Sequence, residues 1–250
     1  MVKKACRINN LKISDRLIIS IDASSKQEVI LLCKRINNNV TTLKLGLELI
    51  YSCGLGIVNT VRSFGYKVML DTKLLDIPNT VCGAIAAISK LGVDKITIHA
   101  LGGSKMLADT KQKLAEESSK LNIIPPLLFA VTILTSLDDE DLDTLGFKNG
   151  FLPSVLNLAN IAIKNGIDGI ICSPNEVKSI REKLGSGFYI ASPGIRLQDD
   201  DKGDQKRIGT PYSAIKDGAD FIIAGRSITA KANPEEAVKK IFIEIERALV

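Results

Sequence analysis

Three charged residues, Asp71, Lys73 and Asp76, lie within six positions of one another. They follow the apolar run 66–70 and precede Pro78, a residue that suits the first turn of a helix. Side chains alternate along a strand, so a strand that reaches Asp71 would point its side chain and that of Lys73 to the same side. The triplet alone would fit a solvated turn. Its place after an apolar strand, where α/β proteins carry their chemistry, predicts a site with a carboxylate beside an ammonium.

Short apolar runs alternate with helix-length segments along the whole chain, and they predict the elements that hold this site. We expect eight strands, at 16–22, 41–45, 66–71, 95–99, 127–133, 169–172, 189–192 and 221–224. We expect helices at 25–38, from Gly46 to Phe64, from Pro78 to Leu91, from Gly103 to about Lys120, on either side of Pro153, and after Pro174.

Eight strand–helix units in 250 residues are what a closed parallel barrel requires. No composition shift or linker marks a second domain. The sequence therefore predicts an α/β fold, a single (β/α)8 TIM barrel over residues 1–250.

Composition and charge narrow the class of protein. The five cysteines are an odd number without C-x-x-C spacing, which argues against a disulfide framework and favours a reduced, cytoplasmic protein. The N-terminus has no apolar leader, and no stretch approaches the length of a membrane span. The net charge is +5, but Lys and Arg are dispersed, Trp is absent and aromatics make up 4%. We therefore expect no nucleic acid and no membrane as partner, and a mild preference for small anions.

The carboxyl ends of the barrel strands should meet at one rim, and charged residues divide that rim into two halves. One half carries acids and lysines: Asp22, Lys44, Asp71, Lys73 and Asp76. Each of these alone would be read as a structural ion pair, and Asp22 as a helix cap. Together they indicate function, because partly buried charges are costly unless they are paired. His99, at the end of the fourth strand, is expected to be packed or hydrogen-bonded rather than catalytic.

The other half of the rim has the composition of a phosphate site. Barrels bind phosphate with the loops after strands seven and eight, where this chain has Arg196, Gly225 and Arg226. Gly225 allows a close backbone approach, and Arg226 offers a guanidinium fork suited to phosphate oxygens. The polar loop 197–209, with Gly203-Asp204-Gln205, is a candidate lid.

The segment 71–80, DTKLLDIPNT, closely resembles the D-x-K-x-x-D-I-P-N-T signature of the orotidine 5'-phosphate decarboxylases. The resemblance extends over most of the chain and is similar in order and spacing to the bacterial form, through SID at 20–22, LKLG at 43–46, IHALGG at 98–103, VTILTS at 131–136, PGIR at 193–196, GDQ at 203–205 and AGR at 224–226. One departure is that bacterial members often have Phe-His where this chain has Leu74-Leu75, which we take as repacking.

The resemblance implies decarboxylation of orotidine 5'-phosphate to uridine 5'-phosphate and CO2, the last step of de novo pyrimidine (UMP) biosynthesis. It implies no cofactor and no metal. Asp71, Lys73 and Asp76 would form the charged network, with Lys73 delivering a proton to C6. It implies that Asp22 and Lys44 hold the ribose hydroxyls, that Thr135 and Ser136 lie at the pyrimidine, and that Arg196, Gln205, Gly225 and Arg226 hold the 5'-phosphate. The rest of the signature, Thr72, Leu74, Leu75, Ile77, Pro78, Asn79 and Thr80, is expected to line the substrate site as well.

The resemblance also implies a homodimer with shared active sites, in which Asp76 reaches the neighbouring subunit's Lys73. Three alternatives stay open. The first is the group of sugar-phosphate decarboxylases and hexulose-phosphate synthases, which share D-x-K-x-x-D but use Mg²⁺; Lys44 and the I-P-N-T continuation argue against it. The others are a catalytically silent nucleotide- or RNA-binding protein and a Schiff-base aldolase that uses Lys73.

Overall fold

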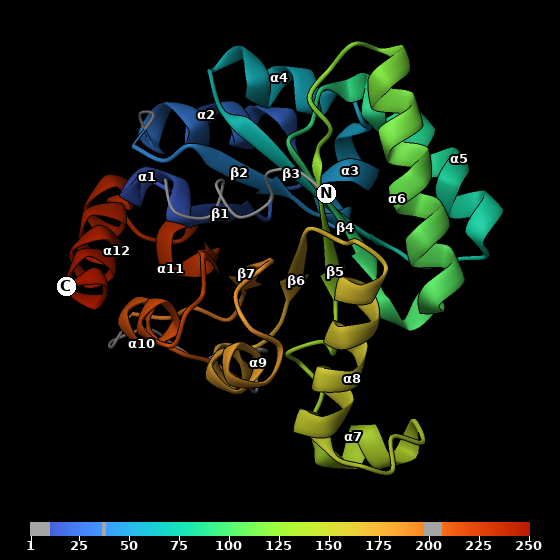
Figure 1. Ribbon diagram of the computed structural model, residues 1–250. Helices are drawn as coiled ribbons and strands as arrows, with labels where there is room; N and C mark the ends of the chain where they lie inside the picture. The colour runs from blue at the N-terminus through green and yellow to red at the C-terminus, as the bar shows by residue number, and fades with distance from the viewer. Residues whose placement is uncertain (1–10, 37–38, 198–206) are drawn as a thin grey trace.

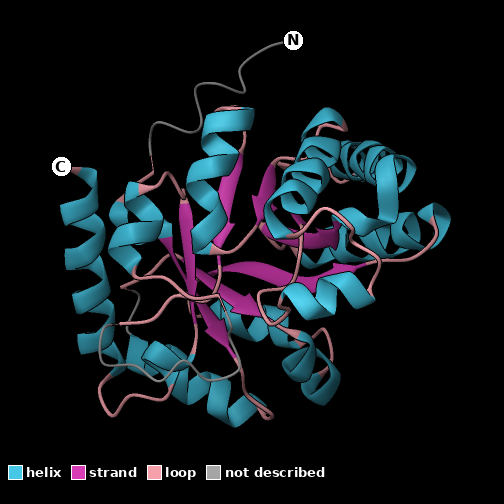
Figure 2. Ribbon diagram, turned by 90° about the horizontal axis from the view of Figure 1, so that it is seen from below, coloured by secondary structure: helices cyan, strands magenta, loops and turns pink. Residues whose placement is uncertain are grey.

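A computed structural model describes residues 11–36, 39–197 and 207–250. In this part of the chain, eight parallel strands close into a barrel in sequence order, and the last strand pairs with the first. They are β1 (Leu17–Ile21), β2 (Thr42–Leu45), β3 (Lys67–Leu74), β4 (Lys95–His99), β5 (Leu127–Val131), β6 (Gly169–Ile171), β7 (Tyr189–Ser192) and β8 (Phe221–Ala224). The strands form the centre and the helices surround them (Figures 1 and 2). The predicted (β/α)8 barrel is confirmed; that one domain spans all of residues 1–250 stays a prediction.

Helices alternate with the strands as expected, but those at 13–16, 211–216, 226–229 and 234–249 were not predicted, and two local details differ. The helices are α1 (Ile13–Arg16), α2 (Lys26–Ile36), α3 (Leu47–Cys53), α4 (Ile57–Ser63), α5 (Pro78–Ile88), α6 (Gly103–Lys120), α7 (Asp139–Thr144), α8 (Phe151–Lys164), α9 (Val177–Leu184), α10 (Pro211–Lys216), α11 (Arg226–Thr229) and α12 (Pro234–Leu249), with short 3-10 turns η2 (Ser89–Leu91), η3 (Ala100–Gly102) and η4 (Pro174–Glu176). The single helix expected up to Phe64 is wrong, because Gly54 adopts a φ of 68° and ends α3. Pro153 lies inside the first turn of α8 instead of between two helices.

The barrel has an inner and an outer apolar layer. The inner layer fills the space between the strands and consists of Ile18, Met69, Phe129, Val131, Ile171, Tyr189, Ala191, Phe221 and Ile223. A side chain at Gly169 would put its Cβ 2.4 Å from the ring of Phe129, so this glycine makes room for the largest fully buried residue. The outer layer packs the strands against the helices. Burial on both faces explains why the strands are apolar runs without polar alternation.

A Gly-x-Asp tripeptide precedes three of the even-numbered strands, at 92–94, 166–168 and 218–220. Each glycine has a positive φ, of 68°, 78° and 108° in that order, at the turn that enters the strand. Each aspartate accepts a hydrogen bond from a backbone N–H at the start of the preceding strand, Asp94 from Val68 (2.9 Å), Asp168 from Leu128 (3.0 Å) and Asp220 from Ile190 (2.8 Å). These carboxylates fasten neighbouring strands at the amino-terminal end of the barrel, so the opposite rim is left for chemistry.

Candidate active site

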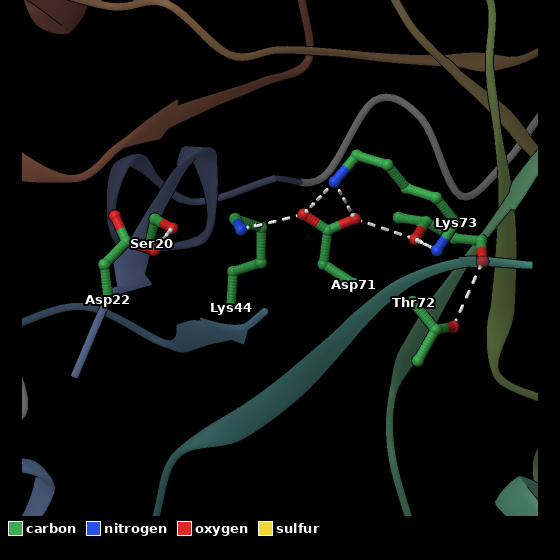
Figure 3. Close-up of polar contacts among 7 residues, drawn as sticks. Ser20, Asp22, Lys44, Asp71, Thr72 and Lys73 are labelled. Carbon is green, nitrogen blue, oxygen red and sulfur yellow. Dashed lines mark hydrogen bonds and ion pairs between the residues drawn. The ribbon is translucent and has the colours of Figure 1, made fainter. Parts of the chain in front are cut away.

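Asp71 is the centre of a buried charge cluster at the carboxyl end of β3. Its Oδ2 lies 2.8 Å from Nζ of Lys44 on β2, and both of its oxygens lie 2.9 Å from Nζ of Lys73. The hydroxyl of Thr97 on β4 donates to Asp71 Oδ1 over 2.8 Å. Figure 3 shows the two ammonium groups converging on this carboxylate. The predicted pairing of Asp71 with Lys73 on one side of the chain is confirmed.

The electrostatics keep Asp71 ionised. Burial alone would raise the pKa of this carboxyl, but the charges of Lys44 and Lys73 and their hydrogen bonds hold its pKa well below the usual range. The Lys44 and Asp71 side chains are only 12% and 8% exposed, whereas that of Lys73 is 35% exposed. Lys73 is therefore the cation of this cluster that a ligand can reach most easily.

The backbone at Lys73 has an uncommon conformation. Its φ is 46°, a value that few residues other than glycine adopt. The ladder between β3 and β4 shifts register between Leu70 and Leu74. The freed N–H of Lys73 donates to Thr97 Oγ1 over 2.9 Å. An irregular strand end, held by a side chain of the neighbouring strand, thus aims Lys73 back at Asp71.

Asp22 and Ser20 mark the β1 side of the site. The hydroxyl of Ser20 donates to Asp22 Oδ1 over 3.1 Å, and Asp22 is exposed. A Cβ on Gly225 would lie 3.3 Å from Asp22 Oδ2 and 3.4 Å from Cβ of Ser20, closer than an ordinary contact. Glycine after β8 therefore allows β8 and β1 to approach closely at the rim.

A cavity of about 280 Å³ opens between the two halves of the rim. Its lining includes the predicted residues Asp22, Lys44, Asp71, Lys73, Thr135, Ser136, Arg196, Gly225 and Arg226. The structure thus brings together the acids and lysines of one half with the glycines and arginines of the other. Arg196 is buried and Arg226 is exposed.

Other predicted site residues lie outside this cavity lining in the single chain: Thr72, Leu74, Leu75, Asp76, Ile77, Pro78, Asn79 and Thr80. Asp76 is exposed, and its Oδ1 accepts from the N–H of Ile77 over 2.6 Å. Pro78 opens α5, as expected. Gln205, with most of the candidate lid, falls outside the described residues. The roles assigned to all of these residues stay predictions.

Sequence reasoning did not find several residues of the site. Ser20 and Thr97 hold the two aspartates, but a serine or threonine in an apolar strand gives no signal until the register of the neighbouring strand is known. Most of the apolar and thiol part of the lining was also missed: Val131, Ile133, Leu134, Ile171, Cys172 and Ile223. His99 is buried, and its Nδ1 accepts from the N–H of Leu101 over 3.3 Å. Burial, and then the charge of Lys73, lower the pKa of His99, which fits the expectation of a packed, hydrogen-bonded residue.

No group of three or more His, Cys, Asp or Glu side chains among residues 11–36, 39–197 and 207–250 could hold a metal ion. None of the helices in the same ranges is both long enough and apolar enough to cross a membrane.

Comparison with known proteins relates this geometry to a family. Residues 15–241 match the model of the orotidine 5'-phosphate decarboxylase / HUMPS family. A relative from Syntrophomonas wolfei, named orotidine 5'-phosphate decarboxylase, is 40% identical over 238 residues, which cover 94% of this chain and 100% of the relative. One of the same name from Haemophilus influenzae is 38% identical and covers 93% of this chain and 99% of its own length. The crystal structure of orotidine 5'-phosphate decarboxylase from Lactobacillus acidophilus superimposes with a TM-score of 0.81 at 34% identity, over 92% of this chain and 99% of that one.

Proposed function

Because the chain belongs to the orotidine 5'-phosphate decarboxylase / HUMPS family, we propose that it converts orotidine 5'-phosphate to uridine 5'-phosphate and CO2, the last step of de novo UMP biosynthesis. One observation carries the proposal. Lys44 and Lys73 meet on the buried carboxylate of Asp71 at one side of a cavity whose other side presents Arg196 and Arg226. The first group suits a reaction that develops negative charge, and the second suits a phosphate.

The chemistry needs a fixed positive charge next to C6 of the pyrimidine. When the bond from C6 to the carboxylate breaks, CO2 leaves and the electron pair stays on C6 in an sp2 orbital with little conjugation. The ammonium of Lys73 opposes this negative charge and then transfers a proton from Nζ to C6. Asp71 pairs with that ammonium as a carboxylate, since its own pKa is held low. A substrate carboxylate placed beside Asp71 is also repelled in the ground state, which favours its loss.

The remaining residues place the substrate. Asp22 and Lys44 bind the ribose hydroxyls, and Thr135 and Ser136 lie against the pyrimidine. Arg196, Gly225 and Arg226, together with Gln205, hold the 5'-phosphate. Because protein charges supply the stabilisation of the carbanion, the reaction uses neither a cofactor nor a metal.

A spectrophotometric assay tests the activity directly. The chain should consume orotidine 5'-phosphate, seen as a loss of its absorbance, and produce uridine 5'-phosphate at the same rate with and without EDTA. Loss of activity in EDTA would favour the Mg²⁺-dependent sugar-phosphate branch of the same family. Tight binding of uridine 5'-phosphate without turnover would instead favour a silent nucleotide-binding protein.

We further propose a two-fold dimer in which Asp76 completes the neighbouring site. Asp76 is exposed and lies between Leu75 and Ile77, which are 51% and 67% exposed. On α3, after the adjacent strand β2, Leu47 and Tyr51 are 45% and 85% exposed. Exposed apolar side chains that follow two adjacent strands, with an exposed acid among them in the chain, fit an interface better than a free surface. In an isologous interface each subunit lends its Asp76 and receives the other's.

Complementation tests the shared site. Lys73→Ala and Asp76→Ala homodimers should each be nearly inactive. Subunit exchange gives hybrids in which one site carries both changes and the other carries neither. With random equal mixing, half of the dimers are hybrids and half of their sites are intact, so roughly 25% of wild-type activity returns. Verified hybrids without recovery would mean that Asp76 serves its own barrel.

A further inference from the structure

Arg207 makes buried contacts with two loops of the rim and with the start of α8. Its Nη1 forms an ion pair with Glu176 after β6, and its side chain is 13% exposed. Nη2 donates to the carbonyl of Leu134 over 2.9 Å and, more weakly, to that of Ile133 over 3.4 Å, both after β5. The guanidinium lies 4.1 Å from the ring centre of Phe151 in α8. The cavity lining formed by the described residues does not include Arg207, so these contacts serve the protein itself.

The backbone next to Arg207 is tied to the arginine half of the rim. Gly209 N–H donates to the carbonyl of Gly194 over 3.2 Å, and Arg196 N–H donates to the carbonyl of Gly209 over 3.0 Å. The carbonyl of Ile195 in turn accepts from the hydroxyl of Ser227 over 3.2 Å, next to Arg226. Residues 194–196, Gly209 and Ser227 therefore form one hydrogen-bonded unit around the phosphate half of the cavity.

The groups that Arg207 contacts lie in or next to the lining of the other half of the cavity, the half assigned to the pyrimidine. Ile133 and Leu134 line the cavity and lead into Thr135 and Ser136. Glu176 accepts from the N–H of Ser173 over 2.9 Å, and Ser173 follows the lining residue Cys172. A displacement of Arg207 would thus change the positions of the residues assigned to the pyrimidine.

We infer that Arg207 is a positioning residue that couples the phosphate half of the cavity to the pyrimidine half. A phosphate that orders residues 194–196 also orders the paired Gly209, two residues after Arg207. The guanidinium then fixes the carbonyls of Ile133 and Leu134, so that Thr135 and Ser136 are held for the reaction. This inference rests on the proposed function, since it assumes that the two halves bind one nucleotide. A shared network of this kind counts as coupling only if the two ends influence each other energetically.

Arg207→Lys separates the coupling from the fold. Lysine keeps a positive charge against Glu176, so no buried carboxylate is left unpaired. Its compact ammonium lacks the planar fork that reaches the acid and the carbonyls together. We expect kcat/KM for orotidine 5'-phosphate to fall about tenfold, the factor for one good hydrogen bond or two weak ones. The kcat/KM for orotidine, which has no phosphate to order residues 194–196, should change less than about twofold.

Arg181→Lys is the matched control. Arg181 also forms a buried pair, with Asp220 Oδ2 at 2.6 Å, and donates to the carbonyl of Phe188 over 2.9 Å. It lies before β7 and β8, at the end of the barrel opposite the cavity. Thermal unfolding should show similar destabilisation in both variants, while the ratio of nucleotide to nucleoside activity should fall only in Arg207→Lys.

The two hypotheses fail in different ways. If the wild-type chain does not turn over orotidine 5'-phosphate, the proposed function is wrong. If the wild type is active but Arg207→Lys loses the same factor on both substrates, Arg207 only supports the fold and the coupling is refuted. An unchanged ratio in Arg207→Lys, or the same change in Arg181→Lys, also refutes it.

Discussion

Replacing Lys95 with methionine should stabilise the barrel at neutral pH. Lys95 is the first residue of β4 and is only 7% exposed. It pairs in register with Met69 and Leu127, which belong to or pack on the inner apolar layer. Its ammonium lies 5.2 Å from the ring centre of Phe221 and donates a long hydrogen bond, 3.4 Å, to Thr42 Oγ1. These contacts replace only part of the hydration that the ammonium loses on folding.

The magnitude follows from the titration of this group. Burial lowers the pKa of Lys95 from 10.5 to about 8, and the nearby charge of Asp94 opposes the change. The difference of about 2.5 corresponds to roughly 3 kcal/mol of unfolding free energy. Because the folded pKa lies below the unfolded one, this destabilisation is complete below about pH 8. It fades as pH rises toward 10.5, where the lysine is neutral in both states.

Urea unfolding under reducing conditions at pH 7, 8, 9 and 10 measures the effect. Lys95→Met should exceed wild type by about 3 kcal/mol at pH 7, and the difference should shrink as pH rises. Comparing the two proteins cancels the titration of the groups that do not interact with Lys95. Lys90→Met, at an exposed position, is the control and should shift stability by less than about 0.5 kcal/mol at each pH. A difference that stays constant with pH, or a less stable Lys95→Met at pH 7, would refute the reasoning.

Three further substitutions have definite expected outcomes. Lys73→Ala should nearly abolish turnover while uridine 5'-phosphate still binds by calorimetry, since the lysine acts mainly as charge develops; equal loss of both would contradict its role. Arg226→Ala should lower kcat/KM for orotidine 5'-phosphate in the steady-state assay, by an amount that corresponds to about 2 to 4 kcal/mol of transition-state free energy, because a charge-assisted phosphate contact is lost. A variant that uses the nucleotide as well as the wild type does would contradict the assignment. Asp168→Ala should lower the unfolding free energy by about 1 to 3 kcal/mol in urea, because the N–H of Leu128 loses its partner, and unchanged stability would show that this carboxylate does not fasten β5 to β6.

The strands were predictable because each is a short apolar run between polar turns. The predicted bounds of β4, β7 and β8 agree with the structure, and the other strands differ by a few residues at their ends. Helix ends were harder, because Gly54 and Pro153 permit more than one local conformation and tertiary packing selects among them. The Gly-x-Asp tripeptides at the amino-terminal end were visible in the sequence. Their role in joining neighbouring strands could not be predicted, because it depends on the register between those strands, which no local pattern supplies.

The contact between Asp71 and Lys73 was predicted correctly, but the strand geometry used to predict it explains the contact only in part. Simple alternation along a strand predicts that both side chains point the same way, and they do meet. The structure reaches this contact differently, through a register shift in β3 and a φ of 46° at Lys73. Such a conformation costs roughly 1 to 3 kcal/mol and persists only when its surroundings hold it.

Thr97 is the residue that holds it. Its hydroxyl accepts from the backbone N–H of Lys73 and donates to the carboxylate of Asp71, so one buried side chain fixes both the strand end and the acid. Thr97 belongs to β4, which approaches the end of β3 only because the two strands lie side by side in the barrel. The position of Lys73, the proposed proton donor, therefore depends on strand pairing as well as on the segment 71–80. The segment 71–80 predicts which groups react, but the geometry that brings Asp71 and Lys73 together depends on the neighbouring strand.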